Sequence, residues 1–346
     1  MSKLVIDPKP NRESLARTIA RRSISIFLMF CVFLFTWLSL PLWLPTAFIA
    51  DLIFPKRRFA CSRFFICLSL IVSFEMLGIL FSPIPLLPYL RFWDKDRREK
   101  VAKSYLILQC FWAGGIFSSL KLLYGLRMEV INQEKVGQGP MILLLRHCSI
   151  ADVLLGTLLV ARPYHILLRY VMKSELRWDP CIDIVAPHMN CLFVDRNALS
   201  PQEEIEKVGN LARNLRPNHG VLLYPEGTRF TKQKKERILK KLQPTSDNYA
   251  YAKNLRHVLP PKLGGVLRLL EVNNNADVIF CAHTGFEGMA KIADFWDGKI
   301  INRTIKVYFW RVGFQEIPSN NEERKAWLLE QWQEMDNQVD MLIHKS

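Results

Sequence analysis

The strongest constraint on this chain is a pair of long, nearly uncharged apolar runs, at residues 24–50 and 64–90. A helix needs about 20 residues to cross the roughly 30 Å hydrocarbon layer of a bilayer, and both runs are longer than that. Pro41 and Pro45 interrupt the first run and further prolines close the second, which is expected to shorten each helix. The sequence therefore predicts an N-terminal helical hairpin, with helices over about 24–50 and 64–90, in or on a membrane.

The charges around these runs leave the topology of the hairpin open. Basic residues lie before, between and after the runs, at Arg17, Arg21, Arg22, Lys56, Arg57, Arg58, Arg63, Lys95, Arg97, Arg98 and Lys100. Positive charge on every side gives no contrast between inside and outside. The hairpin either spans the bilayer or dips into one leaflet and returns, and we favour spanning. We expect an integral or deeply monotopic protein whose following domain lies on the cytoplasmic face.

The overall charge narrows the class of partner. The 346 residues carry a formal charge of +15, and half of them are hydrophobic. Because the basic residues flank apolar helices rather than interleave with aromatic ones, we expect no nucleic-acid partner, and the charge fits a bilayer surface or a phosphorylated substrate. The basic run 232–241 is interpreted as a solvated face, or as a site for donor phosphates or lipid headgroups. The eight cysteines form no C-x-x-C pair, which favours reduced, structural thiols, and no metal site is expected.

After residue 126 the sequence changes to short apolar runs that alternate with helical patterns. Strands are expected at residues 127–131, 141–145, 165–168, 191–194, 220–224, 278–282 and 304–310. Helices are expected at residues 151–160, 201–215, 263–272 and 322–343. This alternation predicts an α/β fold with a mixed, mostly parallel sheet flanked by helices. We divide the chain into a membrane hairpin (1–92), a charged linker with an interfacial helix (93–126) and an α/β domain (127–346).

Two short polar motifs stand where expected strands end. His147-Cys-Ser-Ile-Ala-Asp152 follows the strand at 141–145, and Pro225-Glu-Gly-Thr-Arg229 follows the strand at 220–224. Ligands of such folds tend to bind at the carboxyl ends of the strands. In the first motif, His147 is a candidate general base, and Asp152, about one and a half helical turns further on, is the carboxylate that orients it.

The second motif is typical of an anion site. Arg229 offers paired donors that match phosphate oxygens, and Arg196 is a second candidate for that contact. Glu226 is expected to hold acceptor hydroxyls or to orient Arg229. Gly227 permits close approach of the backbone and offers its N–H to an oxyanion. In the first motif, helix capping is the expected role of Ser149.

Three blocks in this order carry a family resemblance: Arg146-His147-x4-Asp152, Phe193-Val194-Asp195-Arg196 and Pro225-Glu226-Gly227-Thr228-Arg229-Phe230. They resemble the first three motif blocks of the glycerolipid acyltransferases, the lysophosphatidic acid acyltransferase family. The resemblance implies transfer of a fatty acyl group from acyl-CoA, or from acyl carrier protein, to the free hydroxyl of lysophosphatidic acid, giving phosphatidic acid. Another lysophospholipid, such as lysocardiolipin, is the alternative acceptor. A catalytically silent membrane-binding protein is the alternative of another class.

The resemblance also assigns roles to residues, over a region from about 127 to 286. It implies His147 and Asp152 as the catalytic pair, and Arg196, Glu226, Gly227, Thr228 and Arg229 as substrate-binding residues, with no cofactor besides the acyl carrier. The chain departs from the family pattern in two places. Asn190 stands where a glycine is usual before the second block, and the fourth block, at residues 278–284, lacks its proline. His283 in that block is expected to be structural.

Overall fold

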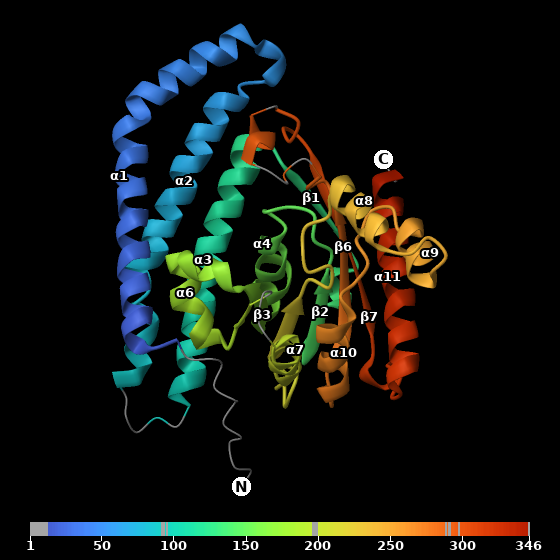
Figure 1. Cartoon of the computed structure of the whole chain (residues 1–346). Helices are drawn as coiled ribbons and strands as arrows, with labels where there is room; N and C mark the ends of the chain where they lie inside the picture. Colours follow the sequence, from blue (N-terminus) through green and yellow to red (C-terminus); the bar gives the residue numbers. More distant parts are fainter. Residues whose placement is uncertain are drawn as a thin grey trace.

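A central sheet with helices on both faces organises the molecule. The computed structural model describes residues 13–90, 94, 96–195, 200–287, 289, 292–296 and 298–344. Figure 1 shows three long N-terminal helices standing on one side of the sheet and helices of the C-terminal half on the other. The site predicted from the sequence lies between these two groups.

Seven strands form the sheet, in the order β1-β7-β6-β2-β5-β3-β4. They are β1 (Arg127–Ile131), β2 (Met141–Leu145), β3 (Leu167–Lys173), β4 (Leu192–Val194), β5 (His219–Leu223), β6 (Asp277–Thr284) and β7 (Thr304–Val312). Each described neighbouring pair is parallel except β6 and β7, which are antiparallel. The sheet is therefore mixed and mostly parallel, and the expected fold class is confirmed.

Strand β2 lies in the middle of this sheet and is completely buried. Successive side chains of a strand point to opposite faces. Ile142 and Leu144 accordingly pack in one apolar cluster, which includes Trp332, whereas Leu143 and Leu145 pack in a second cluster on the other face. A strand that is covered on both faces needs continuous apolar sequence, and this is why the strand could be read directly from its residues.

The helices of the α/β domain vary in length. They are α4 (Val153–Leu155), the π-helix η4 (Gly156–Ala161), α5 (Arg162–Tyr164), α6 (Pro180–Val185), α7 (Pro201–Asn210), α8 (Lys232–Lys241), α9 (Asp247–Asn254), α10 (Leu263–Val272) and α11 (Asn321–His344). Short 3₁₀ turns are η1 (Pro55–Arg57), η2 (Ile84–Leu90), η3 (Gln133–Lys135), η5 (Ser174–Trp178), η6 (Ala186–Met189), η7 (Ile292–Phe295) and η8 (Phe314–Glu316).

Several expected element bounds were wrong, and β3 and α7 differ most. Strand β3 begins at Leu167, because His165 adopts a left-handed conformation (φ 52°) that ends helix α5 just before it, and it continues to Lys173 by pairing with β4. Helix α7 ends at Asn210, since the residues after it form turns that close with Asn214, also left-handed at φ 52°. At His165 a single residue with positive φ separates the helix from the strand, whereas α7 gives way to turns four residues before Asn214.

Three long apolar helices precede or flank the sheet. They are α1 (Leu15–Ile53), α2 (Ala60–Phe81) and α3 (Arg97–Tyr124). By length and composition, α1, the segment Ala60–Leu90 and α3 are each able to cross a membrane. These helices indicate association with a membrane. The division of the chain at residues 92 and 126 stays a proposal.

The prolines of the first apolar run do not shorten its helix, and that expectation was wrong. Helix α1 continues through Pro41 and Pro45 for 39 residues, and Figure 1 shows it bending toward its carboxyl end. A proline inside a helix removes one N–H donor and kinks the helix. Hydroxyl groups support neighbouring carbonyls, since Ser39 Oγ donates to Phe35 O at 2.5 Å and Thr46 Oγ1 donates to a carbonyl one turn earlier at 3.1 Å.

The hairpin lies along the flank of the α/β domain rather than projecting from it. Near the start of α2, the ring of Phe64 stacks on Trp296 with 4.6 Å between centroids. Further along α2, the thiol of Cys181 in α6 donates to the backbone oxygen of Glu75 at 3.2 Å. Arg22 at the start of α1 pairs with the buried Asp183 of α6, with 2.7 Å between Nε and Oδ2. The domain therefore contacts the hairpin at both ends.

These contacts lead us to expect that the hairpin enters one leaflet and returns, the second of the two topologies that the sequence left open. A bilayer enclosing α2 from all sides would also enclose the polar domain packed against it. In sealed vesicles, a cysteine placed at Lys56 in the hairpin turn should react with an impermeant maleimide from the same side as one placed at Lys240 in α8. Labelling of the two positions from opposite sides would show that the hairpin spans.

Candidate active site

The two polar motifs meet at the carboxyl ends of adjacent strands. His147 follows β2 closely and Pro225 follows β5 closely, and β2 pairs with β5 in parallel. The loops are joined by two hydrogen bonds: the His147 N–H donates to Glu226 Oε1 at 2.7 Å, and the Phe230 N–H donates to the His147 carbonyl at 2.6 Å. The topology therefore brings together two segments that are about 80 residues apart.

His147 and Asp152 form a close pair. The distance between His147 Nδ1 and Asp152 Oδ1 is 2.9 Å, and Asp152 is completely buried. The other carboxylate oxygen, Oδ2, accepts the backbone N–H groups of Cys148 and Ser149, each at 2.7 Å. These three contacts fix the carboxylate against Nδ1 of His147, so that the other ring nitrogen, Nε2, is not engaged by Asp152. Residues 147–151 are not helical, so the loop turns back through this carboxylate instead of forming the expected one and a half helical turns.

Glu226 is buried and faces the backbone rather than a substrate. Its Oε1 accepts from His147 as described, and its Oε2 accepts the N–H of Leu259 at 2.9 Å. Burial raises the pKa of Glu226 to about 8, against the opposing effect of these two donors and of Arg146. This geometry favours a positioning role, in which Glu226 joins the His147 loop to the segment before α10, over contact with acceptor hydroxyls.

A buried arginine supports the same loop. Arg146 is 1% exposed and donates from Nε to the His257 carbonyl at 3.0 Å. Its Nη1 donates to the His283 carbonyl at 2.6 Å and to Glu287 Oε1 at 2.5 Å. The Arg146 guanidinium holds the pKa of Glu287 down at about 2, even though burial opposes this. Arg146 therefore ties the end of β2 to β6.

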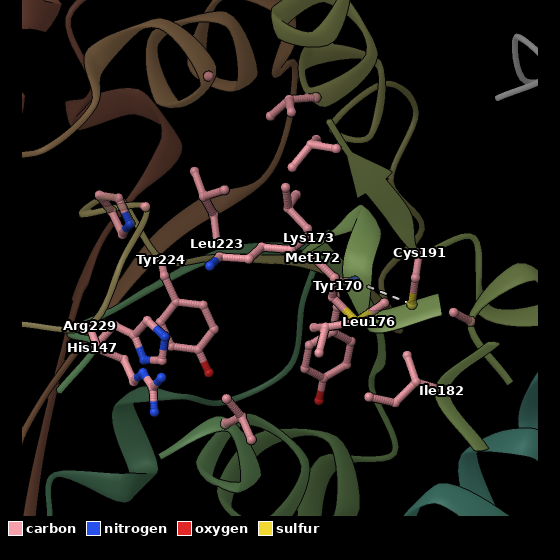
Figure 2. A pocket seen from close by; sticks show the side chains of 18 of the residues that line it. His147, Tyr170, Met172, Lys173, Leu176, Ile182, Cys191, Leu223, Tyr224 and Arg229 are labelled. Atoms are coloured by element: carbon pink, nitrogen blue, oxygen red, sulfur yellow. Dashed lines mark hydrogen bonds between the residues drawn. The ribbon is translucent and has the colours of Figure 1, made fainter. Parts of the chain in front are cut away.

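The other motif residues have distinct positions. Gly227 and Arg229 line the cavity described below, and Figure 2 places Arg229 and His147 together at one end of it. The N–H of Gly227 donates to the Tyr224 carbonyl at 2.9 Å, so it does not serve as the expected oxyanion donor. The hydroxyl of Thr228 accepts from Lys234 Nζ at 2.7 Å. Arg196 lies outside the described residues.

Gly227 itself is required by the shape of the turn. Its φ is +64°, and a Cβ at this position would lie 2.9 Å from Cδ of Lys262. Only glycine adopts this conformation without strain and leaves room for the lysine stem. The role of Gly227 in this structure is therefore to let the turn after β5 close against the segment that contains Lys262.

A cavity of about 670 Å³ extends from His147 and Arg229. This volume is in the range of sites that enclose a small molecule. Most of its wall is apolar, with side chains from β3, η5, α6 and η6, including Met172, Leu176, Ile182, Val185 and Met189. Helix α3 closes one side with Trp112 and Ala113. His147, paired with Asp152, thus faces an apolar space beside helix α3.

Three buried side chains near the pair lie close enough to one another to share a metal ion. One ligand atom each of Cys148, Asp152 and His283 lies within 4.8 Å of the others. However, burial raises the pKa of the Cys148 thiol far above its usual range, and Nε2 of His283 is 3.0 Å from the Arg146 carbonyl. A protonated thiol is a poor ligand and a poor nucleophile. These residues fit a packed support beneath Asp152 better than a metal site.

Comparisons with known proteins find similarity to acyltransferases. A family model described as Acyltransferase matches residues 127–271. The crystal structure of the 1-acyl-sn-glycerophosphate (LPA) acyltransferase PlsC from Thermotoga maritima covers 82% of this chain and 99% of that chain, with a TM-score of 0.50 and 19% identity. Residues 127–271 therefore match the Acyltransferase family model, and the chain has a fold like that of this structure.

The curated relatives include 1-acyl-sn-glycerol-3-phosphate acyltransferases. The chain is 25% identical over 248 residues to mouse 1-acyl-sn-glycerol-3-phosphate acyltransferase epsilon, covering 66% of this chain and 65% of the relative. It is 25% identical over 210 residues to the human delta enzyme, covering 58% of this chain and 53% of the relative. The chain thus spans about half to two thirds of the length of these relatives. It is a distant homologue of the LPA acyltransferases, and the resemblance read from the motifs is confirmed.

Proposed function

We propose that this chain is a membrane-bound acyltransferase that moves a fatty acyl group from acyl-CoA, or from acyl carrier protein, to the free hydroxyl of lysophosphatidic acid, giving phosphatidic acid. The observation that carries the proposal is the pairing of His147 with the buried Asp152, where His147 and Arg229 line an apolar cavity of about 670 Å³. The names of the curated relatives support this acceptor. Because the sequence identity to these relatives is 25%, the headgroup of the acceptor is determined by the assay described below.

His147 acts as the general base in this proposal. The acceptor hydroxyl attacks the thioester carbonyl while His147 takes its proton, and a tetrahedral intermediate forms. When that intermediate collapses, the carbon–sulfur bond breaks and the imidazolium returns the proton to the leaving thiolate. Asp152 holds the ring by Nδ1 and stabilises the imidazolium between these steps. The reaction needs no covalent enzyme intermediate.

The remaining residues are assigned to binding. The apolar wall of the cavity, formed by side chains such as Met172, Ile182 and Met189, suits the hydrocarbon of an acyl chain. Arg229, at the same end as His147, suits the acceptor phosphate, because a guanidinium forms paired bonds with phosphate oxygens. In this proposal, the thioester carbonyl and the acceptor hydroxyl lie beside His147, where the polar end of the cavity meets its apolar wall.

The proposal is tested with the purified full chain in phospholipid vesicles and labelled palmitoyl-CoA or palmitoyl carrier protein. Lysophosphatidate, lysocardiolipin and other lysolipids serve as acceptors in parallel. We expect labelled phosphatidic acid as the main product. Faster acylation of lysocardiolipin would move the assignment to the alternative acceptor. No product with any donor and acceptor would favour the catalytically silent membrane-binding protein.

Arg229→Ala is expected to raise the KM for lysophosphatidate about tenfold to a hundredfold, with a smaller change in kcat. A hydrogen bond to a charged group contributes roughly 1.5–3 kcal/mol, which corresponds to that range. Initial rates over a series of acceptor concentrations measure the effect. Arg213→Ala, which removes an exposed guanidinium after α7, is the matched control and should behave like the wild type. An unchanged KM in the Arg229 variant would show that Arg229 does not bind the acceptor phosphate.

A further inference from the structure

Four polar side chains interrupt the apolar wall of the cavity, and we call them the polar cluster. They are Gln109 of α3, Thr157 of the π-helix η4, Tyr170 of β3 and Tyr224, which follows β5. Gln109 Nε2 donates to Thr157 Oγ1 at 3.2 Å, and Thr157 Oγ1 lies 2.8 Å from Tyr170 Oη. The first three members are therefore connected by hydrogen bonds.

Two atoms of the polar cluster are buried without a hydrogen-bond partner among the described residues. They are Oε1 of Gln109, which is an acceptor, and Oη of Tyr224, whose hydroxyl is a donor and an acceptor. Buried polar atoms are nearly always paired, because an unpaired one costs free energy. Burial raises the pKa of both Tyr170 and Tyr224, so both phenols keep their protons and stay able to donate.

The fold positions these groups on one face of the sheet. Tyr170 lies opposite Leu222 in the parallel pairing of β3 with β5, and Tyr224 is two residues further along, on the same face as Leu222. Figure 2 shows the rings of Tyr170 and Tyr224 side by side, with both hydroxyls pointing to the same side of the cavity. The two phenols therefore face one space.

A close approach of the π-helix completes the cluster. A Cβ at Gly156 would lie 2.3 Å from Leu222 Cδ1 and 3.5 Å from Tyr170 Oη, so only a glycine lets η4 pack this closely on the sheet. π-Helical turns inside helices occur frequently at functional sites. The packing brings the hydroxyl of Thr157, which follows Gly156, within bonding distance of Tyr170.

The polar cluster begins next to the catalytic pair. The rings of His147 and Tyr224 are 4.5 Å apart between centroids, with an angle of 38° between their planes. An acyl chain whose carbonyl carbon lies at His147 therefore passes Tyr224, the nearest member of the polar cluster, with its first few carbons. The rest of the chain would lie along the apolar wall.

We propose that the polar cluster binds a hydroxyl group carried by the acyl chain near its carboxyl end, and that this enzyme prefers hydroxyacyl donors to unsubstituted ones. A hydroxyl supplies the donor that Gln109 Oε1 lacks and a partner for Tyr224 Oη. A plain methylene supplies neither and leaves both polar atoms unpaired in the complex. The inference rests on the proposed acyl transfer and names the chemical class of its donor.

The test compares saturated acyl-CoA donors of equal length that carry no hydroxyl, a hydroxyl on the second or third carbon, or a hydroxyl near the chain end. We expect kcat/KM with lysophosphatidate to be about tenfold to thirtyfold higher for the donors substituted near the carboxyl group. Tyr224→Phe and Gln109→Leu should each reduce this ratio several-fold. Arg213→Ala, at an exposed position outside the cavity, should keep the ratio of the wild type.

The outcomes separate this inference from the function on which it rests. Transfer of all donors at equal efficiency would establish the acyltransferase and overturn the hydroxyl preference. An equal loss for every donor in Tyr224→Phe would show that Tyr224 serves the acceptor hydroxyl instead, and would also overturn it. If the wild type transfers no acyl group, both the proposed function and the hydroxyl preference are overturned. Tyr224→Phe loses only an unpaired hydroxyl, so its thermal unfolding temperature should be at least as high as that of the wild type, which excludes misfolding as the cause.

Discussion

His147→Ala is expected to lower kcat for acyl transfer by about 10²- to 10⁴-fold, the usual contribution of a positioned general base. The ring is fixed by Asp152 at 2.9 Å, and the nearby His283 is completely buried and does not line the cavity. The measurement is single-turnover formation of labelled phosphatidic acid in vesicles. A variant with full activity would show that another group removes the hydroxyl proton.

Asp152→Asn tests the same pair in a different way. The amide can still accept the N–H groups of Cys148 and Ser149 through its oxygen, but its NH₂ group then faces His147 Nδ1. A donor in that place favours the wrong tautomer of the ring and cannot stabilise the imidazolium. We expect a loss of kcat comparable to that of His147→Ala, with little further loss in the double variant. Independent losses that multiply would contradict a joint action of the two residues.

Much of the architecture could be predicted because it rests on local patterns. The strands at 127–131 and 141–145 were expected with the bounds that the structure has, since their apolar residues have the spacing of buried strands. Boundaries set by backbone conformation were less accessible. Nothing in the apolar pattern indicates that His165 takes a positive φ, which sets the start of β3, or that turns replace the helix after Asn210.

The candidate site shows the same division. The motifs identified His147, Asp152 and Arg229 because the types of residue needed for base and phosphate chemistry are few. The contacts of Glu226 depend on Leu259 and His147, which lie 33 and 79 residues away in the sequence. The direction of the Gly227 N–H depends on the local turn, where it donates to the Tyr224 carbonyl. No sequence motif contains these contacts. The polar cluster could not be predicted from the sequence for the same reason. Gln109 belongs to helix α3 and Tyr224 follows strand β5, and both line one cavity only because η4 packs between the sheet and α3.

Glu226→Gln is expected to lower the free energy of unfolding by about 1–3 kcal/mol and kcat by tenfold or more. Each carboxyl oxygen accepts one backbone N–H, from His147 at 2.7 Å and from Leu259 at 2.9 Å. Protonated or not, each oxygen retains a lone pair for its partner. The amide nitrogen of glutamine has none, so one of the two N–H groups would face another donor. Loss of the anchor at the His147 N–H would displace the base.

The pH dependence of stability provides a second measurement on this variant. Burial raises the pKa of Glu226 from 4.5 to about 8, so the group's contribution to stability is fully present below pH 4.5 and is lost as the pH rises through about 8. The difference in unfolding free energy between wild type and Glu226→Gln should therefore shrink across this range, as measured by denaturant unfolding in detergent. Glu203→Gln, at an exposed position of α7, should follow the wild type at every pH. If Glu226→Gln also follows the wild type, in stability and in kcat, the carboxyl of Glu226 does not position the base.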